Sequence, residues 1–273
     1  MRLTQRFPLL LPLRKWQRKK CYYARMFLDK NRYATRKQRP FPYVLYEDSS
    51  LLINRNTGAD IQYQYNKVHN LRLAAATCSQ IVLFPGEVFS LWWLARKADR
   101  REKYKDGLCV HNGTLVAVYG GGLCQLSNQL FWLFLHTPLT ILERHTHQVK
   151  EFPNPDPNDP LGVDATILEG WLDLKARNDT RQPLQIELGF TEDRFWGRIR
   201  TQAPPKFRYA VENDNLQYYH ESGVWKERVD VVRVKLDART GQPISRETLY
   251  TNLCTLGYTP EALDTAVESR AKN

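Results

Sequence analysis

Cys124 is the residue whose surroundings point most directly to chemistry, because it closes a glycine run and opens a predicted helix. The run Gly120-Gly121-Gly122 permits backbone angles that are closed to other residues and lets a substrate approach the main chain. A thiol in the first turn of a helix faces free N–H groups and the positive end of the helix dipole, and both favour the thiolate. Gln125 and the backbone of residues 122–124 are candidate donors to an oxyanion in acyl transfer.

A thiol nucleophile needs a base and a group that orients the base. His145 and His147 are the candidate bases, since both follow the thiol by only a helix and a turn. Their segment, ILERHTHQV, predicts a strand, on which the two-residue period puts Glu143, His145 and His147 on one face. Glu143 and Asp164 are the candidate orienting groups. Periodicity does not choose between the two histidines.

Two other interpretations of the same residues stay open. In the first, Cys124 is an inert buried residue behind a tight glycine turn, with one surface histidine and one core histidine. In the second, Cys124, His145, His147 and Asp164 hold a metal ion, since histidines two residues apart on a strand occur in zinc sites. No metal-type spacing encloses the thiol, and the five cysteines contain no CxxC pair, so we predict no metal and no other cofactor.

Two predicted helices lie on either side of a predicted hairpin. Apolar residues at spacings of three and four predict the first helix from Asn66 onward. The second follows the glycine run, is apolar nearly all round and hence buried, and ends at Pro138. Between them, GLCV and TLVAVY flank an Asn112-Gly113 turn, which is the strongest short hairpin signal.

Short strands dominate the second half of the chain. After a Pro/Asn/Asp-rich loop at 153–160, the segments VDATIL, WLDLKA, LQIELGF and FWGRIRTQ predict strands, and residues 204–257 predict more. The sequence therefore predicts an α+β fold, with two central helices packed on a largely antiparallel, strand-rich second half. We expect an N-terminal arm over 1–42, a main domain over 43–200 and a strand-rich extension over 201–273.

The net charge of +11 is concentrated at the start of the chain. Residues 1–42 hold thirteen Lys/Arg and one acid, and the remainder is nearly neutral. Such an arm can meet an anionic surface, or it can be a solvated extension without a partner; we predict no specific nucleic acid. No run reaches the ~18 apolar residues of a membrane span, and no cleavage site follows the first apolar patch. We therefore expect a cytoplasmic protein that can be peripheral to the membrane.

Five ordered motifs over about residues 62–190 resemble the VanW family. The family takes its name from a protein encoded with vancomycin-resistance genes in bacteria. Some of its surface-located members are understood to act as L,D-transpeptidases on peptidoglycan, with the cysteine of GGGxCQ as nucleophile. The motifs are Asn70 with Ala74, P-G-E-V-F-S at 85–90, G-G-G-L-C-Q-L-S at 120–127, E-R-H-T-H at 143–147 and Asp164-Ala165-Thr166.

The resemblance implies a cysteine-dependent, transpeptidase-like acyl transfer on a cell-wall-type peptide or peptidoglycan precursor. It implies that Cys124 is the nucleophile and favours His147 over His145 as the base, with Asp164 as a further catalytic residue. The alternative is a non-catalytic accessory protein that binds a peptide or glycopeptide in the same cleft. The substrate-binding residues expected from the glycine motif are Gly120, Gly121, Gly122, Gln125 and Ser127.

Overall fold

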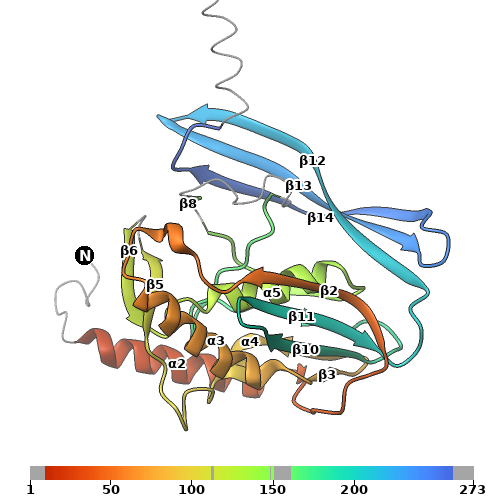
Figure 1. Cartoon of the computed structure of the whole chain (residues 1–273), viewed down its shortest axis with the longest axis horizontal. Helices are drawn as coiled ribbons and strands as arrows, with labels where there is room; N and C mark the ends of the chain where they lie inside the picture. The colour runs from red at the N-terminus through yellow and green to blue at the C-terminus, as the bar shows by residue number, and fades with distance from the viewer. Residues whose placement is uncertain (1–9, 112–113, 148, 151–160, 261–273) are drawn as a thin grey trace, which may run out of the picture.

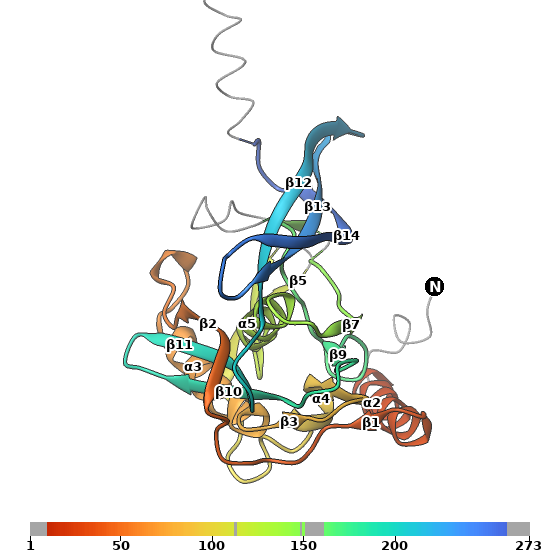
Figure 2. The same ribbon diagram turned by 90° about the vertical axis from the view of Figure 1, so that its right-hand side faces the viewer.

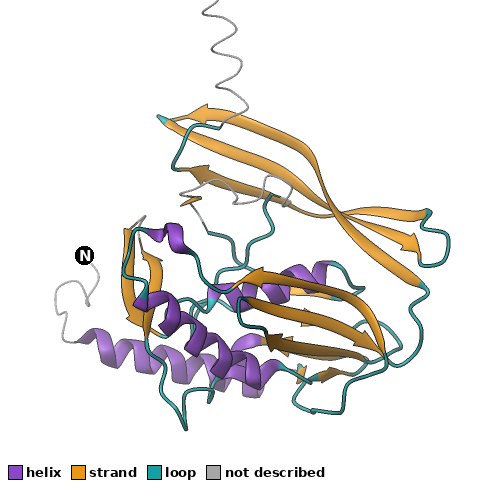
Figure 3. Ribbon diagram, viewed as in Figure 1, coloured by secondary structure: helices purple, strands orange, loops and turns teal. Residues whose placement is uncertain are grey.

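The chain folds into helices and antiparallel-rich sheets, which confirms the predicted α+β class (Figures 1 and 3). The computed structural model describes residues 10–111, 114–147, 149–150 and 161–260. The predicted Asn112-Gly113 turn and the loop at 153–160 lie outside the described residues. None of the helices in the described part is both long and apolar enough to cross a bilayer. The helices are α2 (Leu11–Leu28), α3 (Gln62–Cys78), α4 (Leu91–Ala95) and α5 (Cys124–Leu135).

The two predicted central helices, α3 and α5, pack against a four-stranded antiparallel sheet of order β2-β11-β10-β3. On α3, Leu71, Ala75 and Cys78 are buried at the spacings that predicted the helix. α5 buries residues on nearly every side, as its continuous apolar sequence requires. The strands are β2 (Tyr43–Leu51), β3 (Val82–Leu83), β10 (Leu184–Phe190) and β11 (Arg194–Thr201).

A second sheet, of order β1-β4-β9-β7, incorporates part of the basic N-terminal region. β1 pairs in parallel with β4, so the change of charge at residue 42 does not coincide with a structural break. α2 also lies on the body, where the Tyr22 hydroxyl donates to Asp173 (2.7 Å) and the Tyr23 hydroxyl donates to Glu169 (2.7 Å). The strands are β1 (Arg32–Tyr33), β4 (Glu87–Ser90), β7 (Thr140–Glu143) and β9 (Lys175–Arg177).

The strands expected over 204–257 form a long antiparallel sheet on the opposite side of the molecule from α2 (Figures 1 and 2). Its edge strand β8 runs parallel to β14. The predicted hairpin is present as β5 and β6. These strands are β5 (Asp106–His111), β6 (Thr114–Tyr119), β8 (Val149–Lys150), β12 (Phe207–Glu221), β13 (Val224–Asp237) and β14 (Pro243–Leu256).

One predicted strand is confirmed only at its start and another is absent, and both differences affect the candidate site. In ILERHTHQV, regular pairing ends at Glu143, so the two histidines do not share a strand face. The backbone N–H of His147 donates to the Asp164 carboxylate (2.8 Å) instead of to a neighbouring strand. VDATIL is not a ladder strand either, because the Ala165 N–H donates to the Asn128 side chain (2.8 Å). Side-chain acceptors replace ladder pairing at His147 and Ala165, and one backbone bond, from the Thr166 N–H to the His145 carbonyl (2.7 Å), joins the two segments.

Candidate active site

The glycine run follows a path that leaves no room for side chains. A Cβ on Gly121 or on Gly107 would collide with the backbone of the other, so the two chains pack directly on each other. Gly122 has a φ of +88°, in the left-handed region that favours glycine. Asn70, fully buried on α3, donates to the Gly121 carbonyl (3.0 Å) and exchanges hydrogen bonds with the backbone of Lys105 (2.8 Å each). α3 therefore fixes the loop that leads into α5.

Cys124 is the first residue of α5, and the residue is partly exposed. Its surroundings act on the thiol pKa in opposite directions. Burial opposes ionisation, but hydrogen bonds with His147, with the Ile167 N–H and with Thr166 outweigh it and hold the pKa of Cys124 below its ordinary value. The Thr166 hydroxyl lies 3.8 Å from Sγ. These contacts favour ionisation of a partly exposed cysteine, and a lowered thiol pKa promotes nucleophilic reactivity.

His147 joins the thiol to a carboxylate. Its Nδ1 lies 2.7 Å from Asp164 Oδ2, which leaves the other ring nitrogen for Cys124. The hydrogen bond with Asp164 and then that with Cys124 raise the pKa of His147 to about 10, against the effect of burial. Burial would raise the pKa of Asp164, but the hydrogen bonds from His147 dominate and lower it to about 2. The three groups form a thiol, imidazolium and carboxylate array of the kind that activates a thiol nucleophile.

Arg144 holds the carboxylate in place. Its Nη2 donates to Asp164 Oδ1 (3.0 Å) and its Nε donates to the Asp164 carbonyl (2.7 Å). The same guanidinium also donates to the Gly162 carbonyl (2.7 Å) and to Asn252 Oδ1 on β14 (3.2 Å). The Thr146 hydroxyl adds a bond to Asp164 Oδ1 (2.7 Å). Asp164 is therefore fixed from several directions, and its orientation of His147 does not depend on strand geometry.

Two of the expected substrate-binding residues take other roles. Both hydrogen bonds of the Gln125 amide nitrogen go to β2, to Ser50 Oγ (3.0 Å) and the Leu51 carbonyl (2.7 Å), so this group does not donate to an oxyanion site. Ser127 is fully buried and donates to the Ala165 carbonyl (2.5 Å), which places it out of reach of a substrate. Both side chains fix the start of α5.

The expected donors to an oxyanion are backbone N–H groups near the thiol rather than side chains. Within the described residues, the N–H groups of Gly122, Leu123 and Cys124 have no hydrogen-bond acceptor. Gly121 is different, because its N–H donates to the Val118 carbonyl (2.9 Å). N–H groups at the start of a helix stabilise a developing negative charge.

His145 is directed away from the array. Its Nε2 lies 3.0 Å from Glu143 Oε1, and Glu143 also pairs with Lys175 (2.8 Å), so Glu143 orients His145 and not His147. The alternative of one metal ion shared by Cys124, His145, His147 and Asp164 is not supported. Among the residues that the structure describes, no three His, Cys, Asp or Glu side chains are arranged to hold a metal ion.

Lys67 is a charged neighbour of the site that no sequence motif selected. Its alkyl chain packs against Gly122, two residues before Cys124. Burial lowers the pKa of Lys67 to about 8. The ammonium group has no carboxylate partner among the described residues. Arg144 carried a weak sequence signal, its place inside the E-R-H-T-H motif, whereas Lys67 carried none, because its proximity to the glycine run depends on the packing of α3.

The fold and the array together describe an α+β protein with a candidate cysteine, histidine and aspartate site. Residues 66–200 match the family model for VanW-like proteins. The chain is 49% identical over 265 residues to the vancomycin B-type resistance protein VanW of Enterococcus faecalis strain V583, with 96% of each chain covered. The chain belongs to the VanW family.

A more distant relative shares only part of the chain. The uncharacterized protein YoaR of Bacillus subtilis strain 168 is 32% identical over 146 residues, which are 51% of this chain and 46% of that protein. No solved structure matches the chain.

Proposed function

We propose that this protein is a thiol-dependent acyl transferase that acts on a cell-wall-type peptide and serves vancomycin B-type resistance. The observation that carries the proposal is the hydrogen-bonded series from Cys124 through His147 to Asp164. The resistance role is supported by the printed name of the Enterococcus faecalis relative, to which nearly the whole chain aligns.

In the proposed reaction, the Cys124 thiolate attacks the carbonyl carbon of an amide and forms a thioester. The developing oxyanion accepts hydrogen bonds from the free backbone N–H groups at the start of α5. The His147 imidazolium gives its proton to the amine that leaves. The neutral imidazole then takes a proton from an incoming amine or water, which attacks the thioester and releases the thiolate. Asp164 stabilises the imidazolium throughout and is not itself protonated.

The test is to capture the thioester. We expect acid-quenched mixtures of the full chain with synthetic cell-wall-type peptides to contain an acylated Cys124, identified by mass spectrometry of proteolytic fragments. The Cys109→Ala variant should give the same adduct and Cys124→Ala none. Binding of the peptides with no adduct at any time point would reject catalysis and support the rival function of a peptide-binding accessory protein.

Lys67 is expected to recognise a carboxylate of the peptide. Lys67→Met should raise the peptide concentration for half-maximal thioester formation at least tenfold, because a hydrogen bond to a charged group contributes about 1.5–3 kcal/mol. The affinity of the unmodified protein for the peptide should fall as the pH rises through about 8, since Lys67 then loses its charge. The exposed Lys206→Met is the matched control. If Lys67→Met needs the same peptide concentration for half-maximal thioester formation as the unmodified protein, Lys67 does not bind the peptide.

A further inference from the structure

The outward side of α2 exposes apolar side chains that a soluble helix face usually lacks. Leu13, Trp16, Phe27 and Leu28 are 62%, 58%, 79% and 81% exposed. Trp171 is 53% exposed and lies on the turn that faces α2. The helix lies on the side of the molecule opposite β12–β14, so the long sheet does not cover these residues (Figures 1 and 2).

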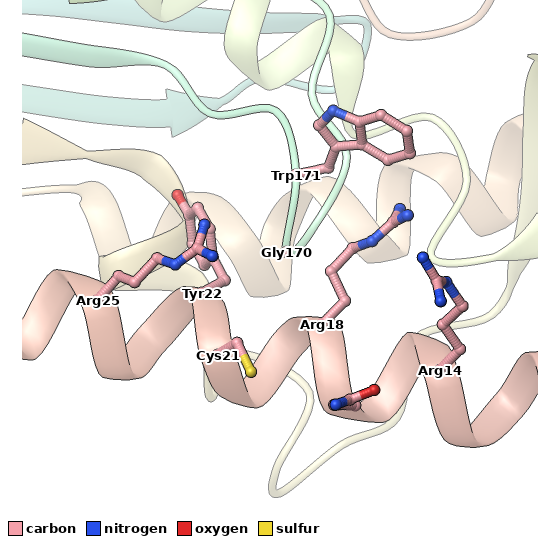
Figure 4. Close-up of a pocket in the computed structure, with 8 residues that line it drawn as sticks. Arg14, Arg18, Cys21, Tyr22, Arg25, Gly170 and Trp171 are labelled. Carbon is pink, nitrogen blue, oxygen red and sulfur yellow. The ribbon is translucent and has the colours of Figure 1, made fainter.

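A row of arginines flanks the apolar side. Arg14, Arg18 and Arg25 stand four and seven residues apart, so the helical period puts them on one face of α2. Together with Trp171 they line a cavity of about 500 Å³ between α2 and the turn at Gly170. Figure 4 shows Arg14 and Arg18 reaching from the helix toward Trp171. The Arg18 guanidinium lies 4.0 Å from the centre of the Trp171 ring.

The positive charge of this cavity is uncompensated. No carboxylate is among its lining residues. None of the three guanidinium groups forms an ion pair with any residue that the structure describes. Guanidinium groups that have no ion-pair partner are well suited to phosphate oxygens, which they bind in a planar, bidentate manner.

The inner side of α2 is anchored, so the exposed set is held in one orientation. Met26 is buried, and the Tyr22 hydroxyl donates to the buried Asp173. Lys19 forms an ion pair with Glu169 (2.8 Å). Gly170, with a φ of +81°, lets the turn approach the backbone of Lys19 closely. The helix presents its apolar and basic residues as a fixed surface.

We propose that α2 and the turn at Trp171 form a docking surface for an anionic lipid bilayer. The arginine-lined cavity receives headgroup phosphates, and the exposed apolar residues enter the boundary between the headgroups and the acyl chains. A helix with aromatic and aliphatic residues on one side and Lys/Arg beside them is typical of interfacial binding. A nucleic acid or an acidic protein segment would satisfy the arginines but leave Leu13, Phe27 and Leu28 in water, so the lipid surface fits the whole set better.

The proposal is tested with the full chain and sedimented vesicles. We expect binding to vesicles of phosphatidylcholine with phosphatidylglycerol, weaker binding as salt rises, and no binding to phosphatidylcholine alone. The triple variant R14E/R18E/R25E should bind at least about 100-fold more weakly, because each basic residue near an anionic surface contributes about fivefold. The control K206E/R208E/R239E has the same change of charge at exposed positions near β12 and β13, and should bind like the unmodified protein.

A second variant tests the insertion of the apolar residues into the bilayer separately from the charge of the arginines. W16S/F27S/L28S keeps every arginine, and it should lose vesicle binding while its circular dichroism spectrum stays unchanged. Three results would overturn the proposal. They are equal binding to the two kinds of vesicle, an equal loss in the control triple variant, and an arginine-dependent affinity for inorganic phosphate without any vesicle binding.

Discussion

The His147→Gln variant is expected to react with iodoacetamide at Cys124 about 10- to 100-fold more slowly than the unmodified protein at about pH 6.5, because a hydrogen bond to a charged group contributes about 1.5–3 kcal/mol. Without the imidazolium, the hydrogen bond and the positive charge that favour the thiolate are lost, and only the hydrogen bonds with the Ile167 N–H and Thr166 still oppose the effect of burial. A thiol with an ordinary pKa of about 8.5 is only about 1% ionised at that pH. The rate is measured by mass spectrometry of the Cys124 peptide.

His145→Gln is the matched control, since it removes an imidazole only two residues away. His145 pairs with Glu143 and not with the thiol, so this variant should react at Cys124 within about twofold of the unmodified protein. A comparable slowing in both variants would mean that general disturbance of the 143–147 segment, and not the contact of His147 with the thiol, sets the reactivity.

The second large effect is expected from Arg144→Met. The variant leaves the Asp164 carboxylate, the Gly162 carbonyl and the Asn252 side chain without their common donor in a largely buried position. Breaking one side of a buried pair costs about 3–5 kcal/mol. We therefore expect the free energy of unfolding in urea to fall by about that amount. Cys124 alkylation should slow as well, because His147 loses its fixed partner.

The comparison for this variant is Arg246→Met, which removes an exposed ion pair with Asp214. Surface pairs contribute about 0–1 kcal/mol, so this change should be small. Arg144→Lys is informative too, because it keeps the charge but not the planar set of donors that reaches acceptors of three residues. An Arg144→Met protein as stable as Arg246→Met would show that Arg144 is not what holds the Asp164 segment.

Local patterns predicted the elements that carry the nucleophile. The position of Cys124 at a helix start follows from glycine permissiveness and apolar periodicity, and the β5–β6 hairpin follows from its turn signal. The partner of the thiol did not follow from periodicity, which placed both histidines on one strand face. That choice depends on hydrogen bonds from residues 17 and 20 positions apart, His147 and Arg144 to Asp164. A local two-residue period contains no information about such contacts.

The basic N-terminal region shows the same limit. Its charge predicted an arm over residues 1–42, and in the structure α2 is attached through Tyr22 and Tyr23 to acids about 150 residues later in the chain. Charge runs describe what a segment presents to solvent, and they say nothing about the few residues on its inner side.

The most direct measurement for this account is the rate of alkylation of each cysteine as a function of pH, resolved by mass spectrometry. Cys124 should react first, with a midpoint below the ordinary thiol pKa. A second change is expected near pH 10, where His147 loses its proton and its positive charge no longer favours the thiolate. Cys78 and Cys254, whose pKa values burial raises to about 12, should stay unreactive while the protein is folded. If Cys124 instead reacts no earlier than the exposed Cys21, and with no change near pH 10, the thiolate and imidazolium pair does not exist.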